Sequence, residues 1–99
     1  MPPIDVDATV IANRRLSRDY NVLTLSAAAV GARTRPGQFV MVRPARMTDT
    51  LLRRPFSVFE ILRDANGAPT AITLLNKRAG RTTNRLYEAE PGERIACIG

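Results

Sequence analysis

Short segments of alternating apolar and polar residues recur along the whole chain, and turn-forming residues separate them. Leu23 and Leu25 fall on one side of such a segment and Thr24 and Ser26 on the other, as a half-buried strand requires. Glycine, proline, asparagine or aspartate bounds each segment. The pattern predicts six strands, near residues 6–13, 21–26, 38–43, 56–62, 70–76 and 94–98.

Three turn signals indicate how these strands are joined. Asn66-Gly67 is the residue pair that favours a tight hairpin turn, so the fourth and fifth strands are expected to pair with each other. Pro36-Gly37 and Pro91-Gly92 have a common form, and each comes directly before a strand. Six short strands fit a small closed barrel, so we expect an all-β fold: a six-stranded antiparallel Greek-key barrel that forms one domain over residues 1–99.

Residues 82–89 have the pattern of one short helix between the last two strands. Thr82 or Thr83 can cap its start, and Leu86 and Tyr87 can pack inward. The helix therefore interrupts an otherwise all-β order of elements.

Composition restricts the class of protein. With 44% hydrophobic and 24% charged residues the chain is an ordinary globular one. No apolar run approaches the roughly 18 residues of a membrane span, and the start lacks the features of a signal peptide. We therefore expect a cytoplasmic protein with no membrane partner.

Cys97 is the only cysteine, and histidine is absent. Neither a disulfide within the chain nor a metal site built on this chain is expected. The apolar neighbours of Cys97 predict a buried thiol on a strand. Without histidine, Ser-His or Cys-His hydrolysis is unsupported, and we assign no catalytic and no metal-binding residue.

The net charge is +6, and Lys77 is the only lysine among the 15 basic residues. Arginine binds phosphate groups in a planar, two-pronged geometry that lysine cannot copy. An anionic partner is the first expectation, and most of the scattered arginines are expected only to keep the surface soluble.

The first basic cluster is Arg53-Arg54-Pro55-Phe56-Ser57. Proline biases the preceding residue to an extended conformation, so Arg54 is expected at the mouth of the following strand, with its side chain outward as a phosphate clamp. Phe56 offers a flat apolar face and Ser57 offers a hydroxyl. Arg53 is interpreted as a surface or accessory charge.

The second basic cluster is residues 76–83, after the fifth strand. Gly80 permits close backbone approach, and the threonine hydroxyls with the N–H groups of a helix start favour an anion such as a pyrophosphate. A solvated turn can have the same composition, so the pairing of the two clusters is what indicates a site. Residues 43–52 lack periodicity, and we expect a loop that orders against a ligand.

Four segments in order resemble one family: "PGQFVMVRP", "LLRRPFSVFEI", "ITLLNKRAGRTTNRL" and "PGERIACIG". They are similar to the flavin-binding barrel of the ferredoxin-reductase superfamily, and within it to the electron-transfer subunit of the class 1B dihydroorotate dehydrogenase. The resemblance covers residues 6–99. It implies an FAD-binding electron-transfer domain of an oxidoreductase.

The resemblance also implies which residues bind FAD. In the family's motifs, the arginine contacts the phosphates, the next three positions line the isoalloxazine and the ribityl chain, and later segments reach the adenine side and the pyrophosphate. The matching positions in this sequence are Arg54, Pro55, Phe56, Ser57, Leu75, Asn76, Lys77, Gly80, Thr82 and Thr83. The family's usual Gly-x-Gly-Thr is Gly80-Arg-Thr-Thr83 here, so a Cβ at position 82 limits backbone approach to the ligand.

Full-length members of the family continue into a nicotinamide-binding domain, and the dihydroorotate subunit adds cysteines for a [2Fe-2S] cluster. Neither feature is in this sequence, so we expect a truncated chain that does not turn over alone. The implied partner is the catalytic dihydroorotate dehydrogenase subunit, with electrons passing from dihydroorotate through FAD to NAD in pyrimidine biosynthesis. The resemblance implies no nucleic acid partner.

Two alternatives stay open. A basic β-barrel can bind RNA or single-stranded DNA, for which several exposed aromatic residues are needed; Tyr20, Phe39 and Phe59 are instead expected in the core. The chain can also be a degenerate flavin barrel that acts as an interaction domain.

Overall fold

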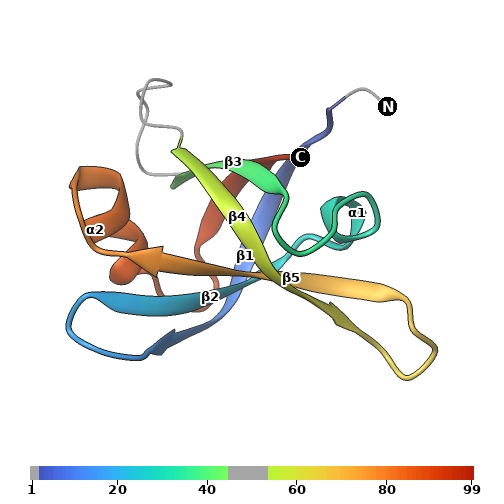
Figure 1. Cartoon of the computed structure of the whole chain (residues 1–99), viewed down its shortest axis with the longest axis horizontal. Helices are drawn as coiled ribbons and strands as arrows, with labels where there is room; N and C mark the ends of the chain where they lie inside the picture. The colour runs from blue at the N-terminus through green and yellow to red at the C-terminus, as the bar shows by residue number, and fades with distance from the viewer. Residues whose placement is uncertain (1–2, 45–53) are drawn as a thin grey trace.

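The computed structural model describes residues 3–44 and 54–99, which contain six strands and two short helices. Their bounds are β1 (Asp5–Arg15), β2 (Tyr20–Ser26), α1 (Ala28–Gly31), β3 (Phe39–Pro44), β4 (Arg54–Arg63), β5 (Pro69–Lys77), α2 (Arg81–Tyr87) and β6 (Arg94–Ile98). The strands close into an antiparallel barrel in the order β1-β2-β5-β4-β3-β6 (Figure 1). The predicted all-β Greek-key barrel is confirmed.

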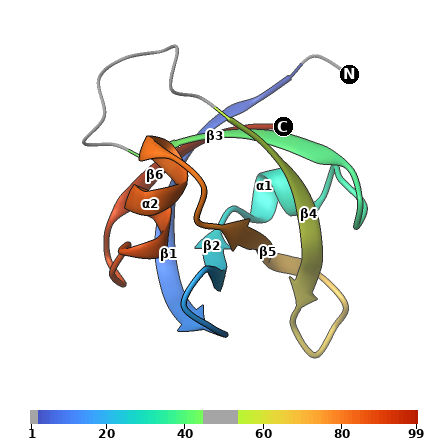
Figure 2. The same cartoon turned by 60° about the vertical axis from the view of Figure 1, so that its left-hand side comes forward.

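Each helix covers a different end of the barrel (Figures 1 and 2). Helix α1, which the alternation pattern does not predict, buries Val30 completely and lies beside Pro69 and Ile72 at the start of β5. Helix α2 follows the end of β5 and buries Leu86 and Tyr87, as predicted. Neither described helix has the length and apolar character needed to cross a membrane.

The barrel interior is filled by aliphatic side chains from every strand. The largest fully buried apolar side chains are Leu23, Leu25, Ile72, Leu74, Leu86, Ile95, Val10, Val30, Val40, Val42 and Val58. Cys97 on β6 is also fully buried, which confirms the prediction of a strand thiol. Because neighbouring residues of a strand face opposite sides, buried Val40, Val58 and Leu74 have the exposed neighbours Phe39, Phe59 and Leu75.

The predicted turns are present. Both Pro-Gly turns are closed by an N–H to C=O hydrogen bond, from Gln38 to Arg35 at 3.0 Å and from Glu93 to Glu90 at 3.1 Å. Strands β4 and β5 form the predicted hairpin, and Gly67 at its tip has a φ of 82°.

Replacing Gly67 with alanine is expected to destabilise the fold by about 1–2 kcal/mol, because a Cβ is disfavoured at positive φ. Gly67→Asn should lose less, since asparagine tolerates this conformation. The free energy of unfolding in urea measures both variants. Equal losses in the two would contradict the role assigned to the backbone conformation.

Strand β4 begins at Arg54, two residues before the predicted start. Arg54 pairs with Val42 and Pro55 with Met41. A proline is tolerated here because this part of β4 pairs with β3 only, so no partner on the other edge needs the missing N–H. Of the predicted loop over residues 43–52, Arg43 and Pro44 belong to β3, and residues 45–53, Arg53 included, lie outside the described residues.

Strands β4 and β5 diverge on one side of the barrel. Their pairing runs from Arg63 and Pro69 up to Val58 and Leu74, where it ends. Before Val58, β4 pairs with β3, and beyond Leu74, β5 pairs with β2. Figure 1 shows the two strands separating toward α2. Beside this divergence, Arg54 of the first basic cluster lies opposite residues 79–83 of the second.

Candidate functional site

Two clefts lie at the first residues of β4. One has a volume of about 180 Å³ and lies between Arg54 and the loop formed by residues 79–83. The other has a volume of about 510 Å³ and extends along residues 55–59. The two clefts are lined by consecutive residues of β4, Arg54 in the smaller one and Pro55 in the larger one. Together they offer a charged compartment and an apolar one.

The charged cleft joins residues far apart in the sequence. Arg54 is exposed and lies opposite Ala79, Gly80 and Arg81. The two arginine side chains carry positive charge, and none of the ion pairs found among the described residues involves either of them. Cations that are not neutralised by carboxylates are suited to bind an anionic ligand.

The loop before α2 is shaped by the hydroxyl of Thr83. This oxygen accepts hydrogen bonds from the backbone N–H groups of Ala79 and Gly80, both at 2.8 Å, and donates one to the Gly80 carbonyl at 3.1 Å. One donor and two acceptor positions are the full capacity of a hydroxyl. Thr83 therefore holds the loop in shape, while the helix cap itself is Gly80 rather than either threonine.

Gly80 is the open point of this loop. A Cβ built there meets no heavy atom within 4 Å, so free space adjoins the backbone. The side chain of Thr82 is only 2% exposed, and it therefore adds little to the surface that a ligand would meet. The departure from the Gly-x-Gly-Thr pattern thus leaves open backbone at position 80, on the same cleft as Arg54.

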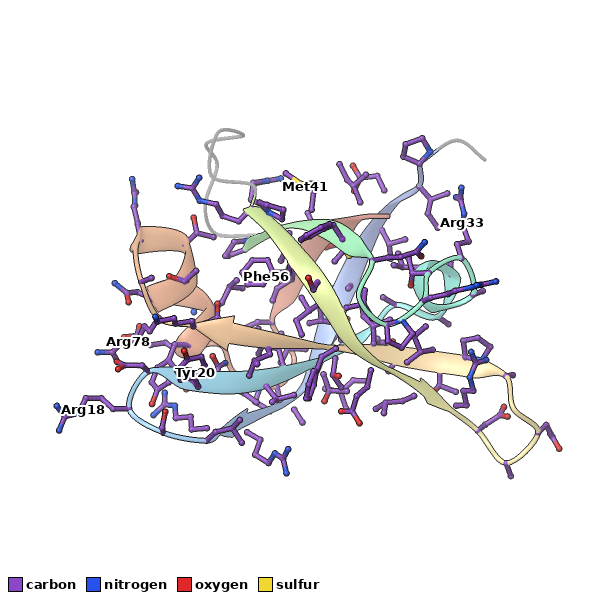
Figure 3. The ribbon with its side chains drawn as sticks, viewed as in Figure 1. Arg18, Tyr20, Arg33, Met41, Phe56 and Arg78 are labelled. Carbon is purple, nitrogen blue, oxygen red and sulfur yellow. The ribbon has the colours of Figure 1, made fainter. Side chains whose placement is uncertain are left out.

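The larger cleft is mainly apolar. Pro55, Phe56 and Ser57 line it from β4, and Leu75 lines it from β5, across the divergence of the two strands. Phe56 is half-buried and packs against the core (Figure 3), while Ser57 is exposed beside it. A volume of this size matches the range of small-molecule sites, roughly 300–1,000 Å³.

Two of the predicted site residues line neither cleft. Asn76 is completely buried, and its side chain donates to Asn21 and to the Thr83 carbonyl. Lys77 is exposed, and its Nζ lies 6.0 Å from the centre of the Tyr20 ring. The other eight predicted residues divide equally between the two clefts.

The prediction that Tyr20, Phe39 and Phe59 belong to the core is wrong. They are 38%, 69% and 48% exposed. Phe39 and Phe59 line the apolar cleft and were missed as site residues. The alternation along β3 and β4 could have indicated their exposure, because their neighbours Val40 and Val58 are the residues that point inward.

Among residues 3–44 and 54–99, no three histidine, cysteine, aspartate or glutamate side chains gather closely enough to hold a metal ion.

The chain is similar to curated proteins from two Geobacillus strains, both named dihydroorotate dehydrogenase B (NAD(+)), electron transfer subunit. The identity is 32% with the protein of Geobacillus thermodenitrificans and 35% with that of Geobacillus sp. strain WCH70, over 91 residues in each case. The match covers 92% of this chain and 34% of each relative, so the chain spans about a third of their length. No protein-family model matches the chain.

The solved structures of an oxidoreductase and a ferredoxin reductase have the same fold. An NADH-dependent reduced ferredoxin–NADP oxidoreductase superposes with a TM-score of 0.74 at 20% identity, over 95% of this chain and 32% of that one. The ferredoxin reductase of carbazole 1,9a-dioxygenase gives a TM-score of 0.73 at 20% identity, over 100% and 29%. The predicted resemblance to the ferredoxin-reductase-type barrel, and within it to the dihydroorotate electron transfer subunit, is confirmed.

Proposed function

We propose that this chain is the FAD-binding domain of a dihydroorotate dehydrogenase electron transfer subunit in the cytoplasm. In the whole protein it would pass electrons from the catalytic dihydroorotate dehydrogenase subunit toward NAD, as a step of pyrimidine biosynthesis. The [2Fe-2S] cluster and the NAD site would belong to other parts of that protein. The similarity to the electron transfer subunits supports this assignment.

The observation that carries the proposal is the pair of clefts lined by consecutive residues of β4. FAD has an anionic diphosphate beside a flat, largely apolar ring system, and the clefts offer the same two chemistries in sequence. The open backbone at Gly80 leaves room for phosphate oxygens next to the Arg54 guanidinium. The residues present therefore fit the cofactor.

Each part of the site has a distinct task in this proposal. Bound FAD would supply hydride and single-electron transfer. Arg54 would neutralise the diphosphate through charge-assisted hydrogen bonds, and the loop shaped by Thr83 would let the phosphates approach the open backbone at Gly80. Phe56 and Leu75 would exclude water from the ring system, and the Ser57 hydroxyl would hydrogen-bond its polar edge.

A titration of the purified chain with FAD tests the proposal. Binding should quench the fluorescence of the flavin and shift its visible absorption band. Absence of binding at high FAD concentration would contradict the proposal for this chain and would favour the interaction-domain alternative.

Enlarging the side chain at position 80 should weaken FAD binding step by step. Gly80→Ala should have a small effect and Gly80→Val a loss of about tenfold, because overpacking a close contact costs about 1–3 kcal/mol. A Cβ at position 80 meets no heavy atom of the described residues within 4 Å, and the φ of −176° there suits any residue. Equal FAD affinities in the series would contradict a close approach of the ligand to this loop.

The exposed aromatic residues give the nucleic-acid alternative its one specific observation. Tyr20 lies beneath Lys77, and exposed aromatic rings near cations can stack on bases. Phe39 and Phe59, however, face the cleft assigned to the flavin. A short oligothymidylate, added to the chain together with FAD, tests this alternative. If the cleft binds the flavin and not bases, the oligonucleotide should not lower the affinity of the chain for FAD.

A further inference from the structure

Three asparagines form a buried ladder between the barrel and helix α2. Asn76 donates from Nδ2 to Oδ1 of Asn21 at 2.9 Å, and Asn21 donates in turn to Oδ1 of Asn13, also at 2.9 Å. Asn21 and Asn76 are completely buried, and Asn13 is half-buried. The three residues come from β2, β5 and β1, which are neighbours in the barrel. The ladder therefore crosses three strands.

Each asparagine also holds backbone carbonyls at α2. The second hydrogen of the Asn76 amide goes to the Thr83 carbonyl at 2.9 Å, and that of Asn21 to the Leu86 carbonyl at 3.2 Å. Asn13 donates to two carbonyls, those of Tyr87 at 3.0 Å and Ala89 at 2.8 Å. The ladder thus fixes the helix from its third residue to beyond its end.

The direction of the ladder is determined by its partners. The Asn76 amide nitrogen donates to the Thr83 carbonyl, which can only accept, so turning the amide around would lose this bond and set two oxygens against each other. The same holds for Asn21. At the beginning of the ladder, Oδ1 of Asn76 is buried and has no hydrogen-bond partner among the described residues. A buried acceptor without a hydrogen bond costs folding free energy, so the hydrogen bonds that this arrangement permits have to offset that cost.

The ladder acts on the same loop as Thr83. The Thr83 carbonyl is bonded to Asn76, and the Thr83 hydroxyl holds the N–H groups of Ala79 and Gly80. A continuous path of hydrogen bonds therefore runs from the barrel wall, through Asn21 and Asn76, to the loop that faces Arg54.

We propose that Asn13, Asn21 and Asn76 are positioning residues that hold loop 79–83 at the distance from β4 that a phosphate-bearing cofactor needs. They do not touch the cofactor with their side chains, since Asn21 and Asn76 have no exposed surface. Their role rests on the proposed FAD function, because the loop is the part of the site that would bind the diphosphate.

Amide hydrogen exchange of the chain without ligand tests the positioning. The backbone N–H of Asn84 donates to the Gly80 carbonyl at 2.7 Å. In Asn21→Ala, the protection factor of this amide should fall at least tenfold. Amides of the central barrel, such as that of Leu74, should lose less. The matched control is Thr73→Val, which also removes a buried hydrogen-bonding side chain, but one that bonds Glu60 and not α2. It should leave Asn84 as protected as in the wild type, relative to Leu74.

FAD titrations of the same variants test the consequence for binding. Asn21→Ala should bind FAD at least tenfold more weakly than the wild type after correction for the unfolded fraction, and Thr73→Val should bind it as the wild type does. If Asn21→Ala does not fold, Asn13→Ala replaces it, since Asn13 is only half-buried and holds the end of the helix.

The outcomes separate this proposal from the function on which it rests. Unchanged protection at Asn84, a loss equal to that at Leu74, or an unchanged FAD affinity overturns the positioning role. If the wild type does not bind FAD, the proposed function fails, and hydrogen exchange alone decides whether the ladder positions the loop.

Discussion

Replacing Arg54 with alanine is expected to weaken FAD binding roughly 10- to 150-fold. A hydrogen bond to a charged group contributes about 1.5–3 kcal/mol, and the phosphate would lose its charged partner on β4. The stability of the apo chain should change little, because Arg54 is exposed and stands at the beginning of its strand. Fluorescence titration gives the affinity, and urea unfolding gives the stability.

The same strand supplies a matched control for Arg54. Arg63 is also exposed, but it lies at the other end of β4, where it donates to the Gly67 carbonyl at 3.0 Å. Arg63→Ala removes an equal charge and should leave the FAD affinity within about twofold at moderate ionic strength, because salt screens distant surface charges. Equal losses in both variants would mean that net charge, rather than a contact from Arg54, controls binding.

Local sequence patterns were sufficient to predict the barrel. Alternation and turn pairs act between residues that are close in the chain, so they determine where strands begin and which hairpin forms. Asn66-Gly67 predicts the pairing of β4 with β5, and the structure has it. The Pro55 signal was harder to interpret, since a proline inside a strand is tolerated only where one edge has no partner, and that depends on neighbours far away in the sequence.

The arrangement of the site could be predicted only in part. Residues 54–57, which the motif predicts as site residues, line the two clefts, whereas Phe39 and Phe59 were assigned to the core on hydrophobicity alone. Hydrophobic residues on an outward face are ambiguous in a sequence, because the same side chain suits a core or a ligand cleft. The ladder of Asn13, Asn21 and Asn76 depends on three strands that meet only in the folded barrel.

Leu74 and Leu75 are adjacent on β5 and provide the sharpest separation of folding from binding. Leu74 is completely buried and faces Leu23 and Val58 on the neighbouring strands, whereas Leu75 is 40% exposed and lines the apolar cleft. Leu74→Ala should cost about 2–5 kcal/mol of stability, because it removes a core side chain and leaves a cavity. Since small domains are stable by only about 5–15 kcal/mol, this is a large loss.

Leu75→Ala should show the opposite combination. Its stability should fall by about 1 kcal/mol or less, since much of the side chain already contacts solvent. Its FAD affinity should fall by roughly 3- to 10-fold, because an apolar contact of about 1 kcal/mol with the ring system is lost. Leu74→Ala, corrected for its unfolded fraction, should bind FAD more tightly than Leu75→Ala. The reverse order of affinities would contradict a flavin bound where β4 and β5 diverge, because Leu75 is the residue of β5 that lines this cleft.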